Sequence, residues 1–87
     1  MHNDEYCCPV CGYLGLAEPP YDKYGCASFD ICPCCGTEFG YDDNKESHNS
    51  LRLRWVKKGM LWFSSSTTPP TNWSPLVQLE EFNNQVN

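Results

Sequence analysis

The chain has 87 residues, with 11 acidic and 6 basic side chains and a formal net charge of −5 at pH 7. A chain of this length forms one small domain, and its net acidity argues against nucleic acid or a membrane surface as its main partner. The first residues lack the basic and apolar regions of a secretion signal, and no stretch reaches the ~18–20 apolar residues of a transmembrane helix. We therefore expect a cytoplasmic protein without membrane contact.

Two cysteine clusters in the first half share the pattern Cys-Pro-x-Cys-Gly, with Cys8 and Cys11 in one and Cys32 and Cys35 in the other. Two residues between thiols allow one tight turn to direct both sulfurs to one point, and the following glycine permits the positive φ that this turn needs. Two such turns supply four thiolates, the set that Zn²⁺ takes in closed structural sites. We predict one structural Zn²⁺ on these four cysteines and, because no coordination position stays open, no enzymatic activity. The alternative of two disulfides is disfavoured by the missing secretion signal and the odd count of seven cysteines.

Short segments around the clusters have the alternating pattern of strands, at residues 13–16, 26–31 and 37–41. In the second of them, Phe29 and Ile31 are expected on the buried side. Cys7, Cys26 and Cys34 are left over from the metal set. We expect Cys26 to be buried in its strand and Cys34 to point outward from its turn, as a reactive thiol or as a residue without a role.

The second half is predicted to be helical. Residues 42–46 form a polar break, and Ser47, Asn49 and Ser50 are candidate caps for a helix over residues 50–58. Gly59 is placed to end that helix in the left-handed conformation. Residues 64–71 have the composition of a linker, and a second helix is expected over residues 75–83, with Ser74 as its cap and a proline at its first position.

Residues 8–43 resemble the CPCC-type proteins, a family of small cysteine-rich bacterial zinc-ribbon proteins. The matching segments are Cys8-Pro9-Val10-Cys11-Gly12-Tyr13, Ile31-Cys32-Pro33-Cys34-Cys35-Gly36 and Asp42-Asp43. One departure is that the Cys-Pro-Cys-Cys string usually belongs to the first knuckle and here lies in the second. This resemblance implies a fold and a metal ion, but no activity.

The chain also resembles rubredoxin, through two Cys-x-x-Cys-Gly knuckles and the aromatic Tyr13 after the first of them. That resemblance implies iron in place of zinc, and one-electron transfer. Cys34 inside the second turn and the helical extension depart from the rubredoxin pattern.

Together these features predict a small metal-stabilised α+β fold, a zinc ribbon with rubredoxin-like knuckles on short β-hairpins, followed by two short α-helices. The expected divisions are a zinc ribbon at residues 1–44, a helix and apolar patch at 45–63, a linker at 64–71, and a C-terminal helix at 72–87 docked on the same domain.

The apolar side chains after the ribbon suggest a protein-interaction module. A partner would contact Trp55, Met60, Leu61, Trp62 and Phe63. The alternative is that these side chains form the core between the ribbon and the helices. Two further hypotheses are an iron electron carrier and a nucleic-acid-binding zinc ribbon. The second of these rests on four of the six basic residues in one predicted helix and on the frequent binding of nucleic acids by zinc ribbons, and the net acidity opposes it.

Overall fold

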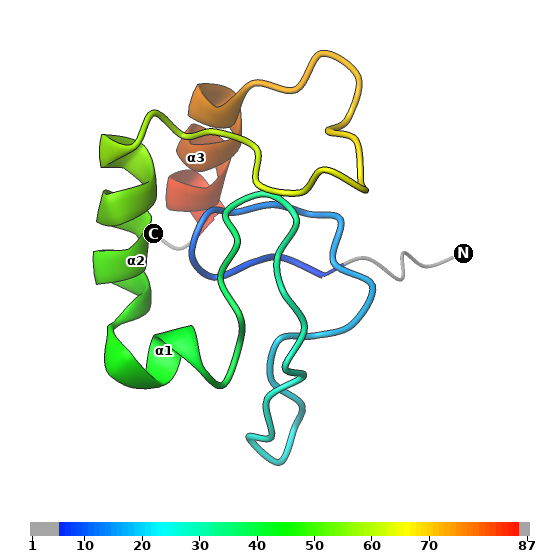
Figure 1. Ribbon diagram of the computed structural model, residues 1–87, viewed down its shortest axis with the longest axis vertical. Coiled ribbons are helices and arrows are strands. Elements are labelled where there is room, and N and C mark those ends of the chain that lie inside the picture. Colours follow the sequence, from blue (N-terminus) through cyan, green and yellow to red (C-terminus); the bar gives the residue numbers. More distant parts are fainter. Residues whose placement is uncertain (1–5, 86–87) are drawn as a thin grey trace.

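The computed structural model describes residues 6–85, and residues 1–5 and 86–87 lie outside that range. Its helices are α1 (Asp42–Lys45), α2 (His48–Lys57) and α3 (Pro75–Gln85). In Figure 1, α2 lies along one side of the looped first half, α3 lies beside the blue first knuckle, and the cyan loop projects away from both helices. Within residues 6–85, no helix is long and apolar enough to cross a membrane.

Single antiparallel bridges stand where the sequence predicted strands. They pair Tyr6 with Leu16 around the first knuckle and Ile31 with Glu38 around the second, and a further bridge pairs Tyr21 with Ala27. The backbone leaves the extended conformation within a few residues of each bridge, at Phe29 (φ 60°) as well as at the glycines of the turns. Because Phe29 turns out of the expected strand, it and Ile31 are 62% and 51% exposed, and the prediction of their burial was wrong.

Helix α2 begins two residues before the predicted range because Ser47 serves as its cap. The Ser47 hydroxyl accepts a hydrogen bond from the Ser50 backbone N–H at 3.1 Å, which satisfies one of the free donors of the first turn. The helix ends before Gly59, whose φ of 101° is left-handed as predicted. Trp55 is its buried residue, whereas Leu53, which a core-facing stripe would include, is 55% exposed.

The short helix α1 was not predicted, since its segment reads as a polar break. Two carboxylates in its first turn accept hydrogen bonds from the preceding backbone, Asp42 from the Glu38 N–H at 2.9 Å and Asp43 from the Gly40 N–H at 2.7 Å. These bonds hold the turn closed. Charges of this sign also suit the positive end of the helix dipole.

Helix α3 begins as the sequence predicted, with the Ser74 hydroxyl accepting from the Val77 N–H at 3.3 Å. Its side chains meet the first knuckle, where Gln78 Nε2 donates to the Cys11 carbonyl at 3.0 Å. The spacing of Leu76, Leu79, Phe82 and Val86 in the sequence predicts one apolar stripe along this helix. Leu76 is nevertheless 66% exposed, and Val86 lies outside the described residues.

The predicted linker, residues 64–71, is held by hydrogen bonds. Trp62 Nε1 donates to the Thr67 carbonyl at 2.7 Å, and the Ser64 hydroxyl accepts from the Thr67 N–H at 3.0 Å. Trp62 packs edge-on against Trp73 with ring centroids 5.2 Å apart. The segment therefore leads from the α2 side of the molecule to the start of α3 along a defined path.

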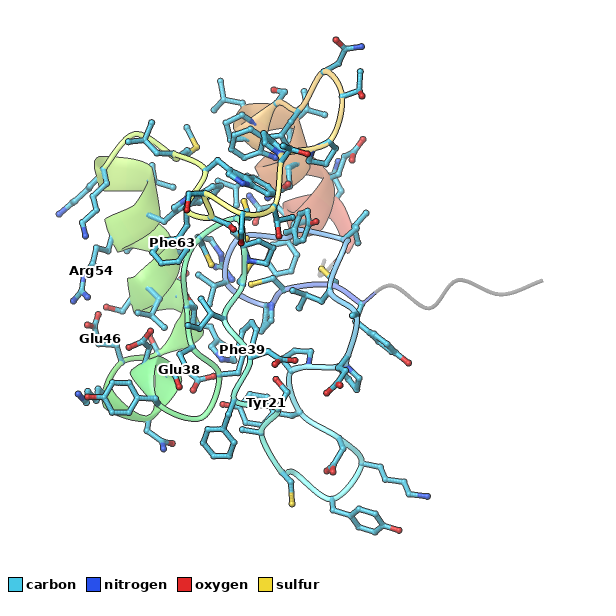
Figure 2. All side chains as sticks on the ribbon, turned by 45° about the vertical axis from the view of Figure 1, so that its right-hand side comes forward. Tyr21, Glu38, Phe39, Glu46, Arg54 and Phe63 are labelled. Atoms are coloured by element: carbon cyan, nitrogen blue, oxygen red, sulfur yellow. The ribbon has the colours of Figure 1, made fainter. Side chains whose placement is uncertain are left out.

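The buried core is centred on the cysteine clusters. Its apolar members are Cys8, Val10, Cys11, Leu16, Cys32, Cys34, Phe39 and Trp55. Figure 2 shows Phe39 in the interior of the looped half. Cysteines make up half of this set, so the packing of the centre depends on what holds the sulfurs together.

Candidate metal centre

The two knuckles have the same backbone hydrogen bonds at an offset of 24 residues (32 minus 8). In the first, Gly12 N–H donates to the Cys8 carbonyl at 2.9 Å and Cys8 N–H to the Tyr13 carbonyl at 2.8 Å; the second repeats both bonds at 2.8 and 2.9 Å. The glycines that close the turns, Gly12 and Gly36, have φ values of 85° and 82°. Only glycine adopts this conformation without strain, which explains its place after each second thiol.

The two knuckles bring together the four predicted sulfurs, those of Cys8, Cys11, Cys32 and Cys35, all within 4.8 Å of one another. Across the knuckles, the Sγ atoms of Cys8 and Cys35 are 3.8 Å apart, as are those of Cys11 and Cys32. A tetrahedral zinc with Zn–S bonds of ~2.3 Å has S–S edges of ~3.8 Å. Disulfide sulfurs lie at ~2.05 Å, and these cysteines are free thiols. The spacing therefore fits four ligands of one metal ion.

The clustered thiols shift one another's pKa in opposite directions. Hydrogen bonds to Cys32 and the other thiols of the cluster, together with burial, raise the pKa of Cys11. The hydrogen bonds that Cys35 receives from Cys11, Cys32 and Cys8 lower its pKa instead. Opposite shifts mean that the cluster alone favours a mixture of thiol and thiolate. Four adjacent thiolates repel one another, so a bound cation is needed to hold all four ionised, and its binding releases the remaining thiol protons.

Cys34 is fully buried, and the prediction that it points outward was wrong. At the 24-residue offset it occupies the place of Val10, which is buried to the same degree. The turn of the knuckle directs both side chains inward, and Gln78 Nε2 lies 3.4 Å from the Cys34 sulfur. Cys34 thus acts as a small core residue beside the ligand set.

Cys26 is exposed, so the prediction of a buried strand residue was also wrong. It lies in a turn organised by Asp22, whose Oδ1 accepts from the Tyr24 and Cys26 N–H groups at 2.8 and 3.0 Å. Such an Asx turn takes the chain out of the extended conformation. Cys7, the third spare cysteine, is half-buried and lies 3.6 Å (Sγ) from the Cys8 carbonyl.

A polar cluster around Asp43 joins the loop after the first knuckle to the helices, and no local sequence pattern predicts it. Asp43, whose side chain is 1% exposed, accepts hydrogen bonds from the Tyr21 hydroxyl, from His48 Nε2 at 3.0 Å and from the Gly40 N–H at 2.7 Å. Burial opposes ionisation, but these hydrogen bonds outweigh it and lower the pKa of Asp43. The ionised form therefore stabilises the folded state.

Replacing this carboxylate should lower stability in a pH-dependent way. Because the folded pKa of Asp43 is depressed, its contribution is complete above the unfolded value of about 3.9 and is lost as the pH falls through the folded pKa. Asp43→Asn should cost about 1–3 kcal/mol at pH 7, and the gap to the wild type should narrow below about pH 4. Urea unfolding of both proteins checks this, since their difference cancels the cysteine protonation that they share. Asp30→Asn, at an exposed carboxyl, is the control; a gap that widens with acidity contradicts the prediction.

The fold and the site define a small cysteine-rich protein with four thiols placed to bind a metal ion. The chain is 50% identical over 72 residues to the uncharacterized protein YoaQ of Bacillus subtilis (strain 168), a match that covers 64% of this chain and 61% of that protein. It is 44% identical over 72 residues to the uncharacterized protein YozI of the same strain, covering 63% of this chain and 60% of the relative. The chain thus spans about three fifths of the length of these relatives. No family model and no solved structure matches it.

Proposed function

We propose that the protein is a zinc-binding protein of the zinc-ribbon type, in which Cys8, Cys11, Cys32 and Cys35 hold one structural Zn²⁺. The observation that carries the proposal is the pair of 3.8 Å sulfur–sulfur distances between opposing knuckles, at the edge length of a zinc–thiolate tetrahedron. The ion joins the two knuckles at the centre of the core. We also propose a cytoplasmic location, because thiols stay reduced in that compartment.

The proposed role of the ion is structural rather than catalytic. A catalytic zinc keeps one position for water or substrate, whereas four protein thiolates complete the tetrahedron. Cys8, Cys11 and Cys32 are fully buried and Cys35 is partly so, which leaves little access to the ion. We therefore propose no enzymatic reaction at this site.

We also propose that the protein is a protein-interaction module, with a contact surface smaller than the sequence predicted. Trp55 is 6% exposed and donates from Nε1 to the Leu61 carbonyl at 3.1 Å, so it belongs to the core. Trp62 is half-buried between the rings of Tyr13 and Trp73. Leu61 and Phe63 are 69% and 60% exposed, and these two are the side chains that we propose for contact with an apolar surface of a protein partner.

The geometry of α2 weakens the alternative of a nucleic-acid-binding protein, because both of its arginines already have partners within the chain. Arg52 is half-buried and bonded to backbone carbonyls, and Arg54 pairs with Glu46. Neither guanidinium of this helix is thus free for phosphate. An affinity for nucleic acid that falls steeply with salt would restore the alternative.

Metal analysis of protein purified without added metal tests the proposal. One zinc per chain in a colourless protein is the expected result. Iron in the site, with visible absorption and a reversible one-electron wave, would instead support the rubredoxin-like electron carrier. A metal-free protein with intact fold would contradict both assignments.

Replacing single cysteines should distinguish the metal ligands from Cys34, which lies beside them without binding the metal. Cys35→Ser removes one of the four clustered sulfurs and is expected to reduce zinc content well below one per chain. Cys34→Ala should keep one zinc per chain, because Cys34 takes the place of the core residue Val10. Zinc content measured by mass spectrometry of the native protein distinguishes them, and equal loss in both variants would show the ligand assignment to be wrong.

A further inference from the structure

Arg52 of α2 forms hydrogen bonds to the backbone of the first knuckle, at the two residues between its thiols. Arg52 donates from Nε to the Val10 carbonyl at 2.7 Å and from a terminal nitrogen to the Pro9 carbonyl at 2.8 Å. Its other terminal nitrogen donates to Asn49 Oδ1 at 3.0 Å, and its guanidinium carbon lies 4.9 Å from the centre of the Phe82 ring. The guanidinium thus has contacts with α2, α3 and the knuckle together.

The bond to Pro9 acts on a ligand through one peptide group. The carbonyl of Pro9 and the N–H of Val10 belong to the same peptide, and that N–H lies 3.4 Å from the sulfur of Cys8, to which it donates. A cation on the oxygen side polarises the peptide and makes its N–H a stronger donor. Arg52 in this way stabilises negative charge on the sulfur of Cys8.

The second knuckle offers the same carbonyls to neutral donors. Pro33, the counterpart of Pro9, accepts from the backbone N–H groups of Phe63 and Ser64 at 3.2 and 2.9 Å. The Cys34 carbonyl, the counterpart of Val10, accepts from the Phe63 N–H at 3.0 Å. The two knuckles share their internal backbone hydrogen bonds but differ in the charge of the donors to these carbonyls. Cys35 in the second knuckle is the partly exposed member of the four ligands.

We propose that Arg52 is a positioning residue of the metal site, which stabilises the thiolate of Cys8 and makes the first knuckle the slow half in metal exchange. The second knuckle, through Cys35, is the half that exchanges first. This inference rests on the proposed zinc site. Hydrogen bonds outside a metal's own ligands commonly change metal affinity by about 10–100-fold, and a cationic donor lies at the strong end of such contacts.

The test compares Arg52→Gln with Arg54→Gln, the same chemical change two residues along α2. Arg54 and Glu46 lie together at the outer edge of the molecule (Figure 2), and this exposed pair contributes little to stability. Zinc transfer to a chromogenic chelator should be about tenfold faster or more for Arg52→Gln, and unchanged for Arg54→Gln. Arg52→Lys, which keeps the charge but cannot bond both carbonyls, should fall between them.

Site-resolved alkylation with iodoacetamide, read by mass spectrometry, distinguishes a charge effect from general loosening. Exposed Cys26 is the internal standard for reagent and time. In the wild type, Cys35 should be modified before Cys8; in Arg52→Gln, Cys8 should gain reactivity relative to Cys32. Equal transfer rates for the two glutamine variants, or equal acceleration at all four sulfurs, would overturn the inference. Metal analysis of the wild type is made first. A zinc content of zero would mean that the proposed function fails, and this result is distinct from either outcome that would overturn the inference on Arg52.

Discussion

Chelation of the proposed zinc ion should unfold the whole protein in one transition. Cysteines form half of the buried apolar residues, and the helices of 10 and 11 residues are too short to persist alone in water. Binding of structural zinc contributes on the order of 10–16 kcal/mol at pH 7, which matches or exceeds the ~5–15 kcal/mol stability of a typical domain. No single core contact has an effect of that size.

The knuckles and the helices α2 and α3 are expected to unfold together, because both helices form hydrogen bonds to the first knuckle. Arg52 of α2 and Gln78 of α3 donate to carbonyls of Pro9, Val10 and Cys11. When the knuckle opens, these acceptors are lost, and Trp55 loses the core around it. Far-UV helical signal should therefore fall as tryptophan emission shifts to the red.

A titration with chelator, followed by circular dichroism and fluorescence on the same sample, checks this prediction. Re-addition of Zn²⁺ should restore both signals, and Cys11→Ser should show the chelated spectrum from the start. Two separate transitions, or helical signal that survives complete removal of the metal, would mean that α2 and α3 fold independently of the knuckles.

The second large effect is expected at Gly12. Its φ is 85°, and a Cβ atom there would lie 2.6 Å from Cβ of Phe82, a contact that requires α3 to move. Gly25 has nearly the same φ, 82°, with nothing within 4 Å of its Cβ position. Alanine at each of these two positions therefore separates the cost of backbone strain from the cost of crowding, since left-handed strain alone costs about 1–2 kcal/mol.

Gly12→Ala should therefore lower the free energy of unfolding by about 2–5 kcal/mol, because crowding adds to the strain, while Gly25→Ala should lower it by about 1–2 kcal/mol. Urea unfolding of the metal-loaded proteins measures both values. Faster amide exchange in α3 for Gly12→Ala alone would locate the damage at the helix contact. Equal losses in the two variants would contradict the close packing of α3 on the first knuckle.

Local features could be predicted from the sequence because they depend on residues a few positions apart. Ser47 and Ser74 cap helices through bonds three residues along the chain, and Gly59 ends α2 within one turn. The turn glycines Gly12 and Gly36 follow from the spacing of the thiols. The four cysteines that the structure brings together were identified in the same way, since each pair is set by its own tight turn.

Only the tertiary structure decides which side of each segment is buried, because burial depends on where the rest of the chain packs. Phe29 and Leu53 match buried patterns, but nothing packs over them enough to exclude water, and both are mostly exposed. Cys34 has the opposite outcome, because the side of the knuckle that it faces is covered by α3 through Gln78.

The contacts of Arg52 join positions 42 and 43 residues apart, and no local pattern marks them. A pattern of apolar and polar residues records the tendency of each side chain to leave water. The burial that each one reaches, and the partner it meets, depend on how distant segments share the small surface around the sulfurs.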